Sequence, residues 1–442
     1  MTWHIVTLAG AEDTYTPTVK PGDQQLVVPF NVPGHPDSMQ SSVHEVLAEH
    51  DLSPSVAAHD LLNAAIASYT ADVRVPREDA FDGWTRDLEL HLAVQDENGW
   101  TEGARILERA LSFLTGDRWR VDVRQSPVSY QRLQGRQPRV VRRLETQTVC
   151  LFSGGLDSFI GAVDQIESLG QVALVGHHSA GGGATSKSQS DALAALRTEY
   201  EESTTPFLQF WVTPPKGEQR ASEITTRGRS MMFIGLGVLA ASGLRAKRLI
   251  IPENGLISLN VPLTNARLGS FSTRTTHPYL ISLMRELLRA LGVDVSIELP
   301  YRFKTKGELL RECANQPMAS KGLSATMSCS HPGANRFLMH DPNMHCGYCL
   351  PCIIRRAAIR ASDISDPTRY AFEDLSQPLS DERRADLRVL KMGLDRYERK
   401  PPRLADVLVP GPLPVSGDEL MEYVGVFRRG LGEVGNFINR SN

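Results

Sequence analysis

The chain has few of the features that mark exported, membrane-bound or nucleic-acid-coating proteins. Met1-Thr2-Trp3-His4 opens no basic-then-apolar signal segment, and no apolar run reaches the length of a membrane span. The 442 residues carry a formal net charge of −3, which argues against a protein coated for nucleic acid. No internal repeat or low-complexity tract appears. We therefore expect a cytoplasmic protein that requires neither a membrane nor nucleic acid.

Cysteine is scarce as well, with six residues in the chain. Four of them crowd into one short stretch: Cys329, Cys346, Cys349 and Cys352. In a reducing cytosol this spacing favours a metal site over disulfides. Four thiolates would complete a closed tetrahedral Zn²⁺ site, structural rather than catalytic because no ligand position stays open. Three histidines can replace one ligand, with Cys329 the member most open to replacement: His331, His340 and His345.

The usual phosphate-binding P-loop, with its Gly-Lys-Ser/Thr ending, is absent. A different glycine turn, Ser153-Gly154-Gly155-Leu156-Asp157-Ser158, takes its place. It follows an apolar run at 149–152 that predicts a buried strand, and it precedes residues 159–169, whose apolar positions recur at helical spacing. Glycines let backbone N–H groups converge, and a helix N-terminus adds partial positive charge. This order predicts an anion seat, with a chance serine/glycine turn as the alternative.

This hexapeptide resembles the pyrophosphate loop of the PP-loop ATP pyrophosphatases, which split ATP between its α and β phosphates and hand AMP to a substrate oxygen. Together with the cysteine cluster it is similar to the QueC-like enzymes, which make 7-cyano-7-deazaguanine from 7-carboxy-7-deazaguanine, ammonia and ATP. The long N-terminal extension is most similar to the QatC-like components of Qat anti-phage defence systems. The resemblance covers about residues 146–360, roughly half of the chain.

The resemblance implies an ATP site with Mg²⁺. Residues 153–158 would hold the pyrophosphate, and Lys306 resembles the late phosphate-contacting lysine, with a solvent-exposed helix-start lysine as the alternative. Arg229 resembles the nucleotide-contacting arginine, whereas Arg227 is expected to be solvated only. Asp157 cannot favourably face phosphate, so we expect it to hold Mg²⁺ or to orient the loop.

Two further loops contain residues that could contact a ligand. Glu253 and Asn254 offer a carboxylate and an amide to a purine-like edge, although a plain turn explains them equally well. Residues 177–183 combine two histidines with three glycines at an edge that neighbours the adenosine in PP-loop enzymes. A flexible surface loop is the alternative there, and the histidines stay unassigned.

Strands alternating with helices predict an α/β fold, a doubly wound parallel sheet of the PP-loop (adenine nucleotide alpha hydrolase-like) type over 146–360. Its strands are expected at 148–152, 172–176, 207–213, 248–252 and 293–299. Its helices are expected near 157–169, 187–202, 222–243 and 277–291. Ligands gather beyond the carboxyl ends of such strands, where all the loops described above lie.

Residues 1–140 predict an accessory α+β domain. Its expected elements are an apolar run at 26–30, a helix capped by Ser53 with Pro54 at its first position, a strand at 88–94, a helix at 101–114 that stops at Gly116, and a strand at 119–123. His59 and His91 are interpreted as surface or packing residues rather than ligands. The arginines between 132 and 143 are interpreted as a solvated linker face rather than a nucleic-acid or partner contact. Residues 361–442 form a C-terminal extension with helices at about 380–397 and 417–438.

Two departures from QueC bear on the product. The interval between Cys329 and Cys346 is longer than is typical, and the usual Tyr-Pro-Asp-Cys-Arg segment is absent. We therefore predict adenylation of a 7-carboxy-7-deazaguanine-like acid and transfer to an amine on a partner protein, a QatB-like acceptor in a Qat-type complex. The alternatives are a 7-cyano-7-deazaguanine synthase using ammonia, a PP-loop RNA-modifying enzyme, or a non-catalytic ATP-binding regulatory subunit. Cys150 and Cys313 are expected in the core, and no catalytic cysteine is expected.

Overall fold

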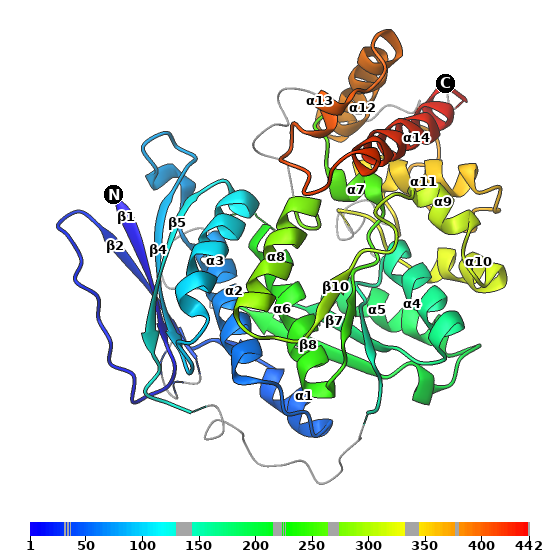
Figure 1. Ribbon diagram of the computed structural model, residues 1–442. Helices are drawn as coiled ribbons and strands as arrows, with labels where there is room; N and C mark the ends of the chain where they lie inside the picture. Colours follow the sequence, from blue (N-terminus) through cyan, green and yellow to red (C-terminus); the bar gives the residue numbers. More distant parts are fainter. Residues whose placement is uncertain are drawn as a thin grey trace.

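The computed structural model consists of two parallel sheets with helices between and around them (Figure 1). It describes residues 1–30, 32, 35, 37–129, 144–214, 223, 225, 227–263, 274–331, 344–375 and 380–440. The arginine-rich linker between 132 and 143 lies outside the described residues, as do Thr226 and His340.

The first sheet has the strand order β2-β1-β4-β5, and all three pairings are parallel. Its strands are β1 (Thr2–Leu8), β2 (Gln24–Pro29), β4 (Asp87–Val94) and β5 (Arg118–Gln125). Because parallel neighbours need crossover connections, α2 (Val56–Arg74) precedes β4 and α3 (Trp100–Thr115) joins β4 to β5. This region is therefore α/β, and the expected α+β arrangement is wrong.

Local signals place most elements of this region. Gly116 ends α3 in the left-handed conformation, as predicted. The N-cap of α2 is Ser55, whose side chain accepts a hydrogen bond from the amide of Ala58, so the prediction of Ser53 is two residues early. Strand β1 and the short helix α1 (Val43–Glu49) were not predicted, although the β-branched and aromatic run in β1 is typical of a strand.

The second sheet has the order β10-β9-β6-β7-β8-β3. Its strands are β6 (Thr148–Leu151), β7 (Ala173–His178), β8 (Phe207–Thr213), β9 (Arg248–Ile250), β10 (Ser296–Glu298) and β3 (Gln40–Ser41). The five strands predicted from the sequence are parallel, and β3 from the N-terminal region pairs antiparallel with β8 at the edge. The chain runs outward from β6 to β8 and then returns to β9 on the other side of β6. A topological switch point therefore lies between β6 and β9.

Helices cover both faces of the second sheet. Successive side chains of its strands point to opposite faces, and the apolar side chains on both faces are buried. On one face lie α4 (Leu156–Leu169), α5 (Gly183–Leu196), α9 (Lys306–Arg311) and α10 (Gln316–Ala325). On the other lie α6 (Arg227–Leu244) and α8 (Pro278–Ala290). Helices α2 and α3 pack against α6 and α8, and one continuous apolar core joins both sheets through these four helices. The N-terminal region thus shares its core with the second sheet.

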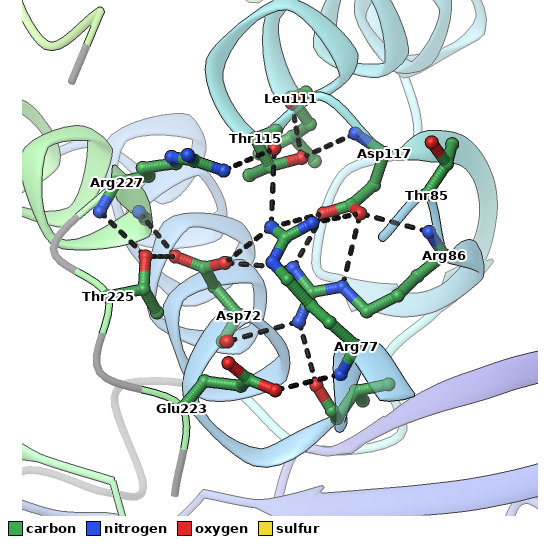
Figure 2. Close-up of polar contacts among 12 residues, drawn as sticks. Asp72, Arg77, Thr85, Arg86, Leu111, Thr115, Asp117, Glu223, Thr225 and Arg227 are labelled. Carbon is green, nitrogen blue, oxygen red and sulfur yellow. Dashed lines mark hydrogen bonds and ion pairs between the residues drawn. The ribbon is translucent and has the colours of Figure 1, made fainter. Parts of the chain in front are cut away.

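A buried ionic network fastens this helical layer (Figure 2). Arg86, 2% exposed, donates to Asp72 Oδ1 at 2.9 Å and to Asp117 Oδ2 at 2.6 Å. The other oxygen of Asp72 accepts from the amide of Gly228 at 3.0 Å, which satisfies a free N–H at the start of α6. Arg227 is buried and donates to the carbonyl of Thr115 at 3.0 Å, so the expectation that it is merely solvated is wrong.

Helix α11 (Leu350–Ala361) leads into the C-terminal extension, which is helical and contains α12 (Asp381–Arg399), α13 (Leu404–Val407) and α14 (Asp418–Arg440). The two long helices confirm the predicted ones. Helix α14 packs against α9, α11 and the short α7 (Gly255–Leu259), above the second sheet in Figure 1. Its apolar residues are buried in these contacts. Among the described residues, no helix combines the length and apolar composition that crossing a membrane requires.

We predict that Asp72→Ala lowers the free energy of unfolding by about 3–5 kcal/mol, because it strips a carboxylate from a buried guanidinium and from the first turn of α6. Urea unfolding followed by circular dichroism measures the change. Asp87→Ala is the matched control: its pair with Arg118 is 3.6 Å long and exposed, so a loss below about 1 kcal/mol is expected. Equal losses in the two variants would contradict a role for the network.

Candidate functional site

A cavity of about 340 Å³ opens at the carboxyl ends of β6 and β9, at the switch point of the second sheet. Its volume falls in the range of about 300–1,000 Å³ that is usual for small-molecule sites. Seven residues predicted for the site line it: Ser153, Gly155, Leu156, Asp157, Ser158, Glu253 and Lys306. Gly154, Arg229 and Asn254 are not among the lining residues.

The glycine turn depends on Gly154, a position where no other residue fits. Gly154 has φ +82°, and a Cβ there would lie 2.6 Å from Ser188 Oγ on α5. Gly155 is the N-cap of α4 and contributes no capping side chain. Ser158 closes the first turn by donating from its hydroxyl to the carbonyl of Gly155 at 2.9 Å. The amino end of α4 therefore faces the cavity through Gly155, Leu156, Asp157 and Ser158, with the partial positive charge of the helix dipole.

Asp157 is the polar centre of the cavity. Its Oδ1 lies 2.7 Å from Lys306 Nζ, and both side chains are only 9% exposed. This contact lacks hydrogen-bond geometry, so Oδ1 has a charge partner but no hydrogen-bond donor among the described residues. Its Oδ2 accepts from Asn254 Nδ2 at 2.6 Å. Lys306 is the first residue of α9, whose start is held by a capping box of Thr305 and Glu308.

Glu253 stands beside this pair and carries a proton at neutral pH. Burial and then the negative charge of Asp157 raise the pKa of Glu253 to about 8, while the charge of Lys306 opposes the shift. The cavity thus combines one ion pair with a carboxyl group that exchanges its proton near neutral pH. Such a group can act as a hydrogen-bond donor or, once deprotonated, as a base.

Asn254 has a different role from the one predicted. Its Oδ1 accepts from the amide of Ile257 and caps α7, while its Nδ2 holds Asp157. The side chain is fully buried and both ends are committed to the protein, so it has no amide free for a purine edge. Glu253 alone of this predicted pair reaches the cavity.

Two other predicted contacts lie away from the cavity. The positive charge of Arg229 has a lowering effect on the pKa values of His177 and Tyr69. Arg229 does not line the cavity, whereas its neighbour Ser230 does. His177 is buried and donates from Nε2 to the carbonyl of Val212 at 3.2 Å. Burial and Arg229 lower the pKa of His177 to about 3. None of residues 177–183 lines the cavity.

The sequence did not reveal the apolar and hydroxyl-bearing part of the cavity wall. It comes from α6, from the segment before α8, and from the two sides of the cysteine cluster: Ser230, Phe233, Ile234, Thr275, Thr276, Met327, Ser328, Pro351 and Ile354. No motif marks these residues. The one available signal was the proximity of Met327, Ser328 and Pro351 to predicted metal ligands.

The four cysteines form a compact, buried cluster. Their sulfur atoms all lie within 4.8 Å of one another, with Cys346 Sγ 3.8 Å from Cys352 Sγ and Cys329 Sγ 4.0 Å from Cys349 Sγ. Tetrahedral Zn–S bonds of about 2.3 Å place sulfurs about 3.8 Å apart, so the cluster fits a zinc ion. The amide of Cys346 also donates to Cys329 Sγ, a hydrogen bond that favours the thiolate.

The three histidines predicted as substitute ligands are not needed. His345 accepts the amide of Ser328 at Nε2, 3.1 Å away, and His331 lies outside the four-sulfur group. The cluster also reaches the cavity: Arg355, fully buried on α11, donates to Ser328 Oγ at 3.2 Å. A metal at the cysteines would therefore hold the wall formed by Met327, Ser328 and Ile354.

We predict that Cys346→Ser releases the zinc ion and lowers the melting temperature by several degrees, because three ligands no longer close the tetrahedron. Elemental analysis after dialysis against a chelator and differential scanning fluorimetry measure the two effects. Cys313→Ala is the control: this buried thiol lies outside the cluster, so bound zinc should be unchanged. Full zinc retention by Cys346→Ser would refute the assignment.

We also predict that Glu253→Gln is more stable than the wild type above pH 8, by a few kcal/mol, and similar to it near pH 4.5. The pKa of Glu253 is raised from 4.5 to about 8 on folding, so wild-type stability falls as pH rises across that interval, whereas the amide does not ionise. Unfolding free energies from pH 4 to 9 provide the measurement.

Glu298→Gln is the control of opposite sign. Two hydrogen bonds from Arg248 lower the pKa of Glu298, so this carboxylate stabilises the fold at neutral pH and loses its effect as pH falls. A flat difference between wild type and Glu253→Gln over the whole range would show that Glu253 is not perturbed.

Comparisons with known proteins add no name to this site. No protein-family model matches the chain, and no curated protein matches it. The case for its function therefore depends on the geometry and chemistry of the cavity.

Proposed function

We propose that the chain is an ATP-dependent enzyme of the QueC-like PP-loop type, which forms AMP and pyrophosphate while it adenylates a carboxylic acid. One observation carries this proposal: the Ser153–Ser158 turn, the amino end of α4 and Lys306 meet in one cavity at the switch point of a parallel sheet. Helix amino ends and lysines are the groups that proteins use for phosphate.

The charges in the cavity suit a nucleotide that arrives with Mg²⁺. In the free protein Asp157 neutralises Lys306. Phosphate would draw Lys306 away, and Asp157 Oδ1, which has no hydrogen-bond donor among the described residues, is then the oxygen placed to face a cation. When bound, Mg²⁺ would neutralise charge on the departing pyrophosphate. Asn254 keeps the carboxylate in position through Oδ2.

The proposed reaction has two steps. An oxygen of the substrate carboxylate attacks the α-phosphorus of ATP, the bond to the bridging oxygen breaks, and pyrophosphate leaves with that electron pair. An amine nitrogen then adds to the acyl carbon, the bond to AMP breaks, and the nitrogen loses a proton as the amide forms. Glu253, whose pKa is about 8, is mostly protonated at neutral pH, and its deprotonated form is the cavity group best suited to receive that proton.

The substrate acid is proposed to be 7-carboxy-7-deazaguanine-like. Support comes from the shape and composition of the cavity: Phe233, Ile251 and Ile354 offer apolar surface to a flat ring, and Thr276 and Ser328 offer hydroxyls to its polar edge. The acceptor is proposed to be an amine on a partner protein of a Qat-type complex. The N-terminal region, joined to α6 through Asp72, would present that partner.

The remaining thiols give no support to an RNA thiolase. Burial raises the pKa of Cys150 strongly and that of Cys313 to about 12, so both stay protonated at neutral pH. Neither lines the cavity. A nucleophilic thiolate step therefore has no candidate among these two residues.

We predict that Lys306→Ala lowers the rate of AMP and pyrophosphate formation by about 10²–10³-fold, because a positive charge facing the leaving group is lost. The assay supplies ATP, Mg²⁺ and 7-carboxy-7-deazaguanine, with ammonium or a candidate partner protein as the amine. Lys304→Ala is the matched control: Lys304 is two residues away but pairs with Glu312 at 2.8 Å, so its rate should change less than twofold.

The products distinguish the alternatives. ADP and phosphate would contradict cleavage between the α and β phosphates. A nitrile formed from ammonium would identify a 7-cyano-7-deazaguanine synthase, and turnover that requires tRNA would identify an RNA-modifying enzyme. ATP binding without turnover, with every acid and amine supplied, would identify a regulatory subunit.

A further inference from the structure

The outer face of the N-terminal sheet carries a cluster of two buried histidines and several more exposed carboxylates. In β1 and β4 the residues that face the helices are apolar, such as Ile5 and Leu90. The alternate residues face the other way. The register sets His4 opposite Glu89 and His91 opposite Asp122, so these four side chains lie together on that face.

The two imidazoles meet head-on. His4 Nδ1 lies 3.0 Å from His91 Nε2, and the rings are within 20° of coplanar. Their centres are 5.3 Å apart, the largest separation that this nitrogen contact allows, so both nitrogens lie on the line between the centres. The side chains are 6% and 5% exposed. A tight polar contact is therefore enclosed beneath the surface of the sheet.

Acidic groups face the outer nitrogens of both rings. Asp23 Oδ2 lies 3.7 Å from His4 Nε2, and Asp122 Oδ2 accepts from His91 Nδ1 at 3.3 Å, beside the hydroxyl of Tyr15 at the same distance. Carboxylates favour N–H on these outer nitrogens. When both outer nitrogens carry a proton, the inner nitrogens direct lone pairs at each other, which is repulsive unless a positive centre lies between or beside them; when His4 carries its proton on Nδ1, that nitrogen donates to His91 Nε2 instead. A proton or a metal ion can supply the positive centre.

The carboxylate of Glu89 is a third possible metal ligand beside the two imidazoles. Glu89 Oε1 lies 3.8 Å from His91 Nε2, and its other oxygen faces Arg120 at 3.4 Å. The donor atoms of His4, His91 and Glu89 all lie within 4.8 Å of one another. A shared proton needs only the two nitrogens, whereas two histidines and a carboxylate are a common zinc ligand set. Carboxylates on the outer ring nitrogens are the usual second layer of such sites.

We propose that His4, His91 and Glu89 bind a divalent transition metal ion of the Zn²⁺ type, in competition with a proton shared by the two imidazoles. Two zinc-bound nitrogens lie about 3.4 Å apart, so the 3.0 Å contact must open slightly while the rings turn toward Glu89. Three protein ligands leave a fourth position for water or another ligand. This site is separate from the cysteine cluster and does not depend on the proposed enzyme activity.

The surrounding charges set its pH dependence. The acids Asp23, Glu89 and Asp122 favour a cation at this site, whether it is a proton or a metal ion. Arg120, which contacts Glu89, and Arg124, which lies 4.3 Å from the centre of the Tyr15 ring, oppose a cation by charge repulsion. Because protons compete for the same nitrogens, metal affinity should fall as pH is lowered from 8 to 6.

The test uses the full chain with its cysteine cluster filled with zinc. Added Co²⁺ should bind with one further equivalent and give weak visible d–d absorption without a sulfur-to-cobalt charge-transfer band. Calorimetry with Zn²⁺ at pH 8 and pH 6 measures the affinity. His4→Gln, His91→Gln and Glu89→Gln should each weaken binding at least about tenfold, and Asp122→Asn by about 10–100-fold as a positioning residue.

Matched controls exclude non-specific effects. His178→Gln changes an imidazole that contacts only a carbonyl, at Ser179, among the contacts described for it, and Glu102→Gln changes an exposed carboxylate on α3; both should bind as the wild type does. Where a histidine variant does not fold, Glu89→Gln and the wild-type pH series decide. No additional equivalent of metal, or equal binding in the ligand variants and controls, overturns the proposal and leaves a proton-bridged pair.

Discussion

A buried carboxylate, Asp157, is the constraint around which the candidate site is arranged. A charge in this position is costly unless it is paired and hydrogen-bonded. Lys306 supplies the charge from α9, and Asn254 supplies the hydrogen bond from the turn after β9. Two segments that are remote from the glycine turn in sequence therefore meet beside it. The pair lies at the wall of a cavity and not in the apolar core, so a ligand that enters the cavity can reach it.

The layer of helices between the two sheets links the N-terminal region to this cavity. Asp72 on α2 bonds the first turn of α6, and α6 contributes Ser230 and Phe233 to the cavity wall. On the other side, the cysteine cluster positions Met327 and Ser328. The buried ionic network and the four-cysteine cluster thus each contact elements that line the cavity.

Patterns local in the chain predicted a large part of this architecture. Apolar runs placed the five parallel strands to within a few residues, and Gly116 marked the end of α3 because glycine readily adopts the left-handed conformation. Metal-ligand spacing identified the cysteine cluster. The predictions were poorer for β1 and for Arg227, whose positions depend on partners far away in the sequence. Arg227 is buried because Thr115 and the ionic network lie opposite it, and nothing near residue 227 signals this.

The sequence by itself determined the elements, the glycine turn and the sulfur ligands, since each depends on neighbours within one turn or one strand. Tertiary structure alone decided which polar groups face the cavity. Asn254 holds Asp157 through a hydrogen bond, Glu253 lies beside that charge, and Arg229 lies away from the cavity, where its charge lowers the pKa of His177. The physical reason is that a side chain's role depends on the burial and charge of groups brought beside it by the fold, and these come from several segments at once.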